Sequence, residues 1–284
     1  MVLIGEGGIR KLATHLNSDG SVAYAFRLDD CEVPINDLIG HRLKLVYRDR
    51  ILCTHCGRKT NKSFSQGYCF PCFKKLAACD TCIVSPEKCH FSEGTCREPE
   101  WGRSFCFQPH IVYLANSAGL KVGITRETQV PTRWIDQGAT AALPLYRVNS
   151  RYLSGCIEVV CKQFVSDRTP WQSMLKGKTP ELDLYTEAAN LVARVERDVL
   201  SMSDAGAGDD MPVCIEKLSA SILNINYPVT VWPDKVVSLS FDKSSEIEGR
   251  LLGVKGQYLI LDTGCLNIRK FTAYQISIFS DAVI

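Results

Sequence analysis

Apolar and polar residues alternate in places along residues 1–50, as in the runs VAYAFRL and HRLKLVYRDRIL. Alternation at every second position is typical of a β-strand with one buried face, so we expect short antiparallel strands in this region. Residues 213–284 return to the same pattern in six runs, with the turns VKGQ and DTGC between the later ones: VTVW, VVSLSF, GRLLGV, GQYLILD, CLNIRKF and YQISIF. Several short strands at regular spacing predict a small barrel or curled sheet, which the N-terminal strands could complete.

Parts of residues 110–204 have apolar positions at the spacing of an α-helix. Residues 110–178 are expected to form a strand, a turn, a strand, a helix, a strand and a helix. The second of these helices has apolar residues at the i, i+3, i+4 and i+7 positions of one face: Ile157, Val160, Cys161 and Phe164. A longer helix is expected in ELDLYTEAANLVARVERDVLSM, with an apolar stripe of Leu184, Ala188, Leu191, Val192, Val195 and Val199. The run SDAGAGDDMP that follows has the composition of a loop or linker.

Residues 51–108 differ from both regions, because they have few periodic apolar positions and many Gly, Pro and Cys residues. Such a segment cannot build a core alone and needs additional cross-links. We therefore expect an α+β protein in five parts: a β segment at 1–50, a Cys-rich zinc-binding segment at 51–108, a small α/β domain at 109–178, a helix and linker at 179–211, and a small β-domain at 212–284.

Composition places the chain among ordinary globular proteins. Its 284 residues suffice for about two domains, and its 45% hydrophobic and 23% charged residues can build a sizeable core. The net charge of +2 by itself favours no anionic partner. No apolar run reaches the length of a membrane span, and the N-terminal run MVLIGEGGIRKLATHL lacks the apolar stretch and cleavage site of a signal peptide. We therefore expect a cytoplasmic protein.

Cysteine is the unusual residue, since the chain has 14 and nine of them fall between Cys53 and Cys106. Clustered cysteines in paired spacings, without an export signal, indicate metal binding in a reducing compartment rather than disulfide bonds. The other five are scattered, and we expect them to be small buried hydrophobic residues: Cys31, Cys156, Cys161, Cys214 and Cys265.

The clearest metal site lies in the run CTHCGRKTNKSFSQGYCFPC, whose cysteines have the spacing C-x2-C-x12-C-x2-C: Cys53, Cys56, Cys69 and Cys72. In each C-x2-C knuckle two thiolates can converge on one ion, and four thiolates close a tetrahedral zinc site that has no open position. We therefore expect a structural zinc ion here, with an iron–sulfur cluster or free thiols as the alternatives. His55 lies inside the first knuckle and is not expected to be a ligand.

A second metal site is expected in the run CDTCIVSPEKCHFSEGTCREPEWGRSFC, which begins with another C-x2-C knuckle. The spacing of its later cysteines is irregular for a zinc ribbon, and an iron–sulfur cluster is a real alternative because thiolates bind both. Our first choice of ligands is Cys79, Cys82, Cys89 and Cys96, with Cys106, His90 and His110 as competitors.

Local charge divides the middle of the chain into two parts. Residues 103–178 contain ten Lys and Arg but four Asp and Glu, whereas residues 179–211 contain eight acidic and two basic residues. The small net charge therefore hides a basic module beside an acidic helix. A basic module suits contacts with phosphate groups, so the expected partner is nucleic acid, either DNA or structured RNA.

Within the basic module, the run VYLANSAGLKVGIT is followed by an Arg-Trp pair and, on the next helix, by a glutamate. This order resembles the GIY-YIG nuclease superfamily, most closely its divergent branch, over about residues 110–170. Tyr113 matches the tyrosine of the first motif, Gly123 the glycine of the second, Arg133 the arginine of the first helix, and Glu158 the metal-binding glutamate. The whole chain also resembles an uncharacterised bacterial family that joins such a domain to a Cys-rich segment.

The chain departs from the superfamily pattern at three points. Ile111 stands where the first motif has Gly, Lys121 stands where the second has Tyr, and the downstream Asn common in these nucleases has no clear counterpart. Loss of the second tyrosine removes one group that could orient the attacking water. It leaves the first tyrosine, the arginine and the glutamate in place.

The resemblance implies a Mg²⁺-dependent endonuclease that cleaves phosphodiester bonds. Glu158 would hold one Mg²⁺, whose Lewis acidity stabilises the leaving oxygen. Arg133 would stabilise the extra negative charge of the transition state with its planar guanidinium. Tyr113 would act as the general base or position it, and a neighbouring cation, Arg126 or Lys121, would lower its pKa from about 10.

Each of these residues also has a purely structural interpretation. Tyr113 suits a half-buried sheet position, Arg133 could contact Trp134 or cap its helix, and Glu158 could pair with Lys162 at i+4. One alternative function is therefore a non-catalytic, zinc-containing DNA- or RNA-binding protein on a nuclease-derived scaffold. Another is a metal- or redox-sensing regulator with an iron–sulfur cluster in the second cysteine group.

Overall fold

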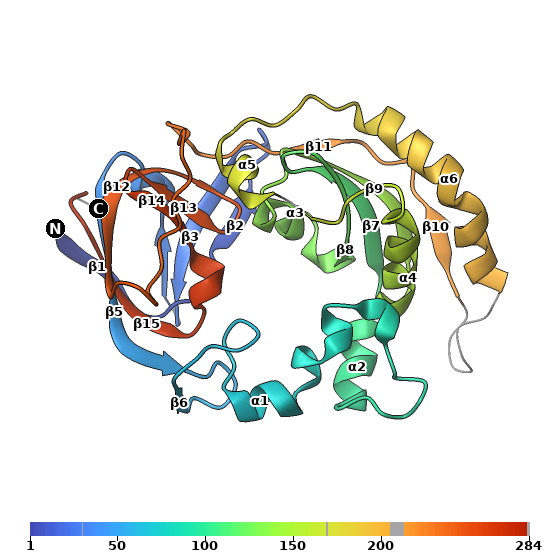
Figure 1. Ribbon diagram of the computed structural model, residues 1–284, viewed down its shortest axis with the longest axis horizontal. Coiled ribbons are helices and arrows are strands. Elements are labelled where there is room, and N and C mark those ends of the chain that lie inside the picture. The colour runs from blue at the N-terminus through green and yellow to red at the C-terminus, as the bar shows by residue number, and fades with distance from the viewer. Residues whose placement is uncertain (30, 169, 205–212, 283–284) are drawn as a thin grey trace.

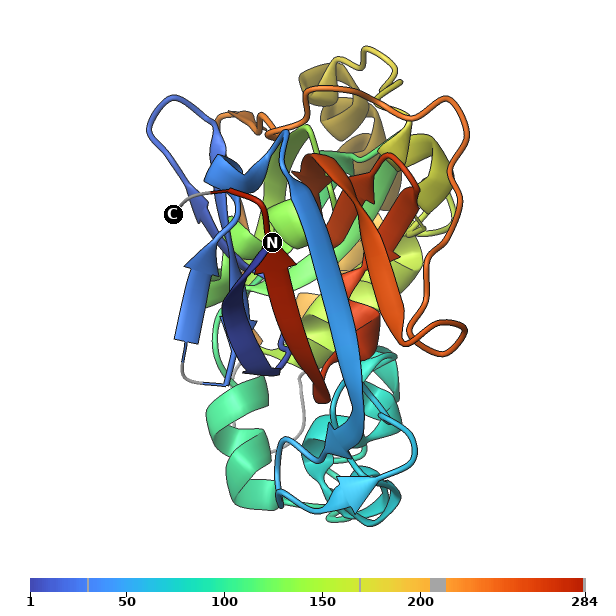
Figure 2. The ribbon, with the colours of Figure 1, turned by 90° about the vertical axis from the view of Figure 1, so that its left-hand side faces the viewer.

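The largest sheet joins strands from both ends of the chain (Figure 1). The computed structural model describes residues 1–29, 31–168, 170–204 and 213–282. The seven strands, all paired antiparallel, are in spatial order β1 (Val2–Gly8), β15 (Tyr274–Ser280), β5 (Arg42–Leu52), β12 (Glu246–Lys255), β13 (Tyr258–Leu261) and β14 (Gly264–Asn267), with β6 (Lys59–Thr60) also paired to β5. The N-terminal and C-terminal strands therefore lie side by side, as Figure 2 also shows.

A smaller antiparallel sheet packs against this one and contains β2 (Ala13–Leu16), β3 (Val22–Leu28) and β4 (Cys31–Pro34). We call the two sheets together the β-body. The alternation predicted for VAYAFRL is confirmed, because every second side chain of β3 is buried. Phe26 of β3 and Leu45 of β5 belong to one hydrophobic core. The first 50 residues and the last 40 or so thus fold around a common core.

The β-body is not the closed barrel that the strand pattern allowed. β1 and β14 form the two ends of the seven-stranded order and do not pair with each other. The runs VTVW and VVSLSF also form no strands, since each makes one isolated bridge, Val229 with Gly253 and Ser238 with Cys265. Pro233 lies between these two runs, and proline has no N–H to donate to a sheet ladder. Of the two predicted alternatives, a small barrel and a curled sheet, the barrel was therefore wrong.

A second sheet carries the basic module. Its strands are in spatial order β10 (Ile215–Lys217), β9 (Ala141–Val148), β7 (His110–Asn116) and β8 (Leu120–Arg126), with β11 (Leu223–Asn224) also paired to β9. Three helices accompany this region of the chain: α3 (Thr132–Asp136) between β8 and β9, α4 (Arg151–Cys161) after β9, and α5 (Trp171–Leu175). The predicted order of elements is confirmed from β7 to α4, and α5 is an additional helix within residues 110–178. Residues after 212 contribute to this sheet through β10 and β11 and to the β-body through β12 to β15.

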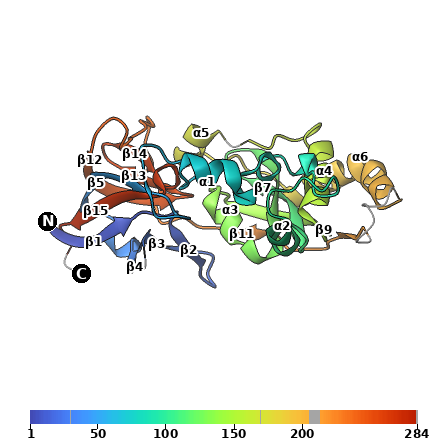
Figure 3. The ribbon, with the colours of Figure 1, turned by 90° about the horizontal axis from the view of Figure 1, so that it is seen from below.

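The two faces of the second sheet contact different parts of the molecule. Tyr113 and Trp134 lie on the face that joins the core of the β-body. Val112 and Leu114, which point the other way, pack with α4 and with α6 (Leu184–Asp204) in a separate core. Figure 3 shows the resulting elongated shape, with the β-body at one end and α6 at the other.

The long helix α6 has the predicted apolar stripe, and all six of its expected members are buried. On α4 the prediction was correct for Ile157 and Cys161 but wrong for Phe164. That residue lies beyond the end of the helix and is exposed, with the guanidinium of Arg194 over its ring. None of the helices among the described residues is long and apolar enough to cross a lipid bilayer.

The Cys-rich segment connects the β-body to the second sheet along the lower side of Figure 1. Besides the short strand β6, its regular structure consists of two short helices and three 3₁₀ turns: α1 (Phe70–Lys75), α2 (Pro99–Cys106), and the turns at Ala77–Cys79, Thr81–Ile83 and Pro86–Lys88. The last of these turns packs against α4, where a Cβ on Gly155 would lie 2.7 Å from Pro86.

The five scattered cysteines do not share one environment. Cys161 and Cys265 are buried as expected, and Cys156 is partly buried. The same expectation was wrong for Cys31 and Cys214, which are exposed because they lie at the edge strand β4 and just before β10.

A buried glutamine ties α3 to the β-body. The Leu12 N–H donates to Oε1 of Gln257 at 2.7 Å, and Nε2 of Gln257 donates to Oδ1 of Asp136 at 2.8 Å. Asp136 also pairs with the Lys11 ammonium at 2.8 Å. These bonds join the N-terminal segment, the turn after β12, and α3 in one polar network.

We expect Gln257→Leu to lower the free energy of unfolding by roughly 2–4 kcal/mol, because a buried N–H and a buried carboxylate each lose a partner. Urea unfolding of this variant and of Gln163→Leu, a matched change at an exposed position, would measure the difference. Equal stability of the two variants would contradict a structural role for this network.

Candidate functional site

The first cysteine group forms where the β-body meets the Cys-rich segment. Cys53 follows directly on β5 and Cys69 directly precedes α1, so two regular elements hold the two knuckles. The four predicted Sγ atoms, including that of Cys72, lie within 4.8 Å of one another, and those of Cys56 and Cys69 are 3.7 Å apart. Gly57 closes the first knuckle with a φ of +70°, a value that favours glycine. The predicted convergence of the four cysteines is confirmed.

The surroundings of this group suit thiolates bound to a cation. Burial raises the pKa of the Cys53 thiol, but backbone hydrogen bonds at Cys56, Cys69 and His55 bring it down to about 6. Burial and the neighbouring thiols raise the pKa of Cys72 to about 12. Thiolates at this spacing repel one another, and a divalent cation removes that repulsion. Four thiolates are also the donor set of structural zinc, so the group could hold such a metal ion.

The predicted members of the second cysteine group are divided in space. Cys79 borders the first group: burial raises the pKa of its thiol, and the Cys53 thiol raises it further. Cys82 lies among other members of the second group. Its pKa is raised to about 11 by burial and, to a smaller extent, by the nearby side chains of Cys89, Asp80, Cys106 and Cys96.

A second set of possible metal-ligand atoms, within 4.8 Å of one another in the described part of the chain, comes from Asp80, Cys82 and His90. Oδ2 of Asp80 is 2.9 Å from Nε of Arg97 and 3.4 Å from Nε2 of His90, so cationic or polar groups already contact this carboxylate. Neither Asp80 nor Arg97 could be singled out from the cysteine spacing. The ligands of a second ion therefore stay a prediction.

His110 and Arg126 face each other across β7 and β8, away from Tyr113. This pair lies three residues from Tyr113 along β7, which is about 10 Å in an extended strand. His110 is buried, its Nδ1 shares a 2.7 Å hydrogen bond with the Gln108 carbonyl, and burial lowers its pKa to about 4. The Arg126 guanidinium lies 4.0 Å from the centre of the Phe105 ring. Arg126 is therefore not the cation beside Tyr113.

Tyr113 is fully buried at the centre of the predicted constellation. Its hydroxyl donates to Oε1 of Gln137 at 2.9 Å, and its ring packs edge-on against Trp134. Gly123 lies opposite on β8, where a Cβ would be 2.7 Å from the tyrosine oxygen, so only glycine fits. Burial raises the pKa of Tyr113 to about 12, although Arg133 acts in the opposite direction. The expected fall in this pKa does not occur.

Lys121, Arg133 and Glu158 share the neighbourhood of Tyr113. Burial and then Arg133 lower the pKa of Lys121 to about 8, while Glu158 raises it. Arg133 and Glu158 also act on the pKa of Tyr113, in opposite directions. Because β8 is the outermost strand of its sheet and α4 packs on it, Glu158 can reach this edge from the opposite face. The structure thus brings four of the five predicted catalytic residues together.

Glu158 does not stand alone, because the Lys162 ammonium bridges it to a second carboxylate. Nζ of Lys162 is 3.3 Å from Glu158 and 3.1 Å from Asp167. The Glu158 side chain is 13% exposed, and burial raises its pKa despite Lys162. The i+4 pair was predicted from the sequence, but Asp167 was missed, since it lies in the loop after α4 and belongs to no motif.

Most of the chain, from residue 40 to residue 276, matches the family model described as a protein of unknown function (DUF2797). The chain belongs to the DUF2797 family. No curated protein and no solved structure matches it. In this DUF2797 protein the matched span begins just before β5 and ends within β15, so it contains both cysteine groups and the surroundings of Tyr113, whereas β1 to β4 precede it.

We expect Cys69→Ser to lose one equivalent of zinc per chain, because a hydroxyl cannot replace the thiolate as a soft ligand. Elemental analysis of the purified full-length protein would measure this, with Cys214→Ser, an exposed cysteine outside both groups, as the control. Unchanged zinc in Cys69→Ser, or iron with labile sulfide in the parent protein, would contradict a zinc site at the first cysteine group.

Proposed function

We propose that this DUF2797 protein binds nucleic acid and cleaves its phosphodiester bonds with Mg²⁺, as a divergent relative of the GIY-YIG nucleases. The observation that carries the proposal is the convergence of Lys121, Arg133 and Glu158 around Tyr113 at one sheet edge. Phosphodiester hydrolysis can use these three groups: a guanidinium to stabilise negative charge, an amine with a lowered pKa to accept a proton, and a carboxylate to hold a metal ion.

The carboxylates around Lys162 suit a magnesium ion. Glu158 and Asp167 both lie within 3.3 Å of one ammonium, so their oxygens already converge on a position occupied by positive charge. Magnesium prefers oxygen ligands and keeps several waters, so two carboxylates are enough. When bound, the ion would supply Lewis acidity at the leaving oxygen. Lys162 would have to turn away from Glu158 for the ion to enter.

The remaining residues take roles that follow from their pKa values. Lys121, with its pKa lowered to about 8 by burial and Arg133, can accept a proton from water near neutral pH. Arg133 can stabilise the charge that develops on the phosphoryl oxygens. Tyr113, with its pKa raised to about 12 by burial, stays protonated and holds the Gln137 side chain by donating its one hydroxyl proton to Oε1. In this proposal, Lys121 replaces Tyr113 as the general base.

The first cysteine group is proposed to hold a structural zinc ion. Its thiolates tie the end of β5 to α1, and four thiolates leave no open position for catalysis. The ion would therefore stabilise the Cys-rich segment rather than take part in cleavage.

A second candidate function is nucleic-acid binding without turnover. The burial of Tyr113 and the ion pair between Glu158 and Lys162 favour it, because both contacts must change before a metal ion and a phosphate enter. A panel of duplex DNA, single-stranded DNA and structured RNA, assayed for binding and for cleavage, would separate the two functions.

We expect Glu158→Gln to reduce the cleavage rate by roughly a thousandfold or more while leaving nucleic-acid affinity unchanged, because the amide no longer holds the metal ion. Cleavage of a labelled substrate, with and without Mg²⁺, would measure this. Glu196→Gln, an exposed change on α6, is the matched control. Cleavage at the parent rate by Glu158→Gln would show that Glu158 is not the metal ligand.

We expect kcat/KM to rise with pH up to about 8 and then level off, since the proton acceptor must be neutral Lys121, whose pKa is lowered to about 8 by burial and Arg133. Lys121→Met should be slow and lack this rise. A pH profile that keeps its shape in Lys121→Met would assign the proton acceptor to another group.

A further inference from the structure

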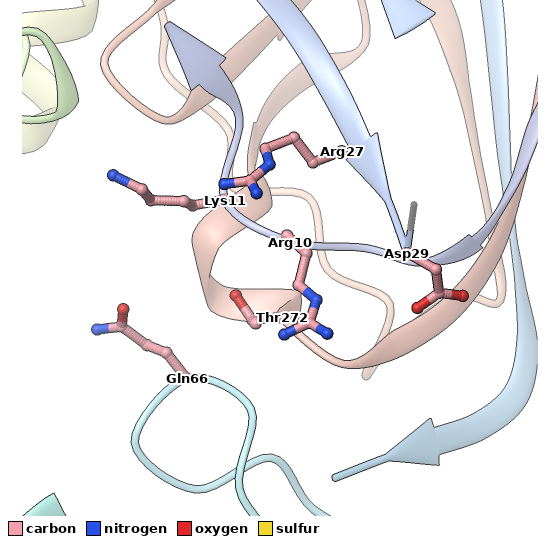
Figure 4. A pocket seen from close by; sticks show the side chains of 6 residues that line it. All are labelled: Arg10, Lys11, Arg27, Asp29, Gln66 and Thr272. Atoms are coloured by element: carbon pink, nitrogen blue, oxygen red, sulfur yellow. The ribbon is translucent and has the colours of Figure 1, made fainter. Parts of the chain in front are cut away.

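A cationic cavity of about 440 Å³ lies between the β-body and the Cys-rich segment. Figure 4 shows the side chains that line it: Arg10, Lys11, Arg27, Asp29, Gln66 and Thr272. The first four come from the N-terminal strands and their connections, Thr272 comes from the segment before β15, and Gln66 faces them from the loop between the two knuckles. We call this cavity the anion pocket. Its volume is in the range of small-molecule sites.

Positive charge dominates the lining of the anion pocket. Lys11 is paired with Asp136, and Arg27 contacts Glu32 at 3.3 Å in an exposed pair that water screens. Arg10 makes no ion pair within 4.0 Å with any residue that the structure describes. The carboxylate of Asp29 is partly engaged elsewhere, because its Oδ2 accepts the Gly8 N–H at 2.8 Å. The pocket therefore has charge available for an anion.

The cations continue from the anion pocket toward the catalytic residues. Nε of Arg269 donates to Oε1 of Gln66, and the Thr272 hydroxyl donates to the Arg269 carbonyl at 2.9 Å. Burial and then Arg133 lower the pKa of Arg269, so these two guanidinium groups are electrostatic neighbours. A row of cations thus leads from the pocket past Arg269 to Arg133.

We propose that the anion pocket binds a phosphate group of the nucleic-acid strand, at a distance from the bond that is cut. Arginine guanidinium groups match phosphate oxygens in geometry, and a row of cations suits a strand that carries a negative charge at every phosphate. This inference rests on the proposed function in naming a nucleic-acid strand. The phosphate chemistry of the pocket does not depend on cleavage, and a free nucleotide could supply the same group.

The deciding experiment measures binding without cleavage. Full-length parent protein, Arg10→Ala, the Arg10→Ala/Arg27→Ala double variant and the control Arg197→Ala, which is exposed on α6, would be titrated with a labelled duplex and a labelled single strand in EDTA. Each titration would be repeated at several salt concentrations. The same four proteins would be titrated with inorganic phosphate and with a 5′-mononucleotide. Melting curves would show that the variants are folded.

The proposal predicts that the two arginine variants bind the duplex more weakly than the parent. The slope of log K against log salt should become shallower by about 0.9 for each removed arginine that contacts a phosphate. Arg197→Ala should behave as the parent. If the protein binds no nucleic acid but Arg10→Ala loses phosphate or mononucleotide binding, the nuclease proposal fails and the pocket serves a free phosphorylated ligand. If both arginine variants match Arg197→Ala with every probe, the anion pocket is not a phosphate site.

Arg10→Lys separates charge from shape. It should keep the salt dependence of the parent but bind less tightly, because an ammonium cannot make the two parallel hydrogen bonds of a guanidinium. Affinity equal to that of the parent would show that Arg10 contributes charge alone and would overturn the bidentate contact.

Discussion

The buried carboxylate of Asp136 holds α3 against the β-body. Its side chain is 5% exposed, and it accepts hydrogen bonds from Lys11 and Gln257, both of which belong to the β-body. A buried carboxylate that loses its partners destabilises a fold strongly, so α3 cannot shift without a large loss of free energy. Arg133 lies one turn earlier on the same helix. The contact that stabilises the packing therefore also places this guanidinium relative to Lys121 and to the anion pocket.

The edge position of β8 is the second constraint. Tyr113 and Gly123 lie on the face toward the β-body, whereas α4 packs on the opposite face. In the middle of a sheet, groups on opposite faces are separated by the backbone. At the outermost strand they can approach one another around the edge, which brings Glu158 toward Lys121. Burial at this edge alters proton affinities more than the nearby cations do, and it raises the pKa of Tyr113 instead of lowering it.

The features that the sequence predicted well are local ones. Two C-x2-C knuckles bring their own thiols together, and the stripe on α6 follows from its period alone. The features that it missed depend on contacts between distant segments. The register of β7 and β8 decides that Lys121, and not Arg126, accompanies Tyr113, and residue spacing does not contain that register. Asp167 belongs to no recognisable motif, so the sequence did not point to it. The anion pocket is lined by three segments that are far apart in the sequence.

The pairing of the first strands with the last ones has a consequence for synthesis. β5 pairs with β12 and β15, so its partners leave the ribosome about 200 residues later, which takes roughly 10–40 s at the usual rates of elongation. During that interval both edges of β5, in the part before its contact with β6, are open to pairing with other chains. Five charged residues along β5 oppose such pairing: Arg42, Lys44, Arg48, Asp49 and Arg50. The same charges that face solvent in the folded protein would keep the nascent chain from aggregating until its final strand arrives.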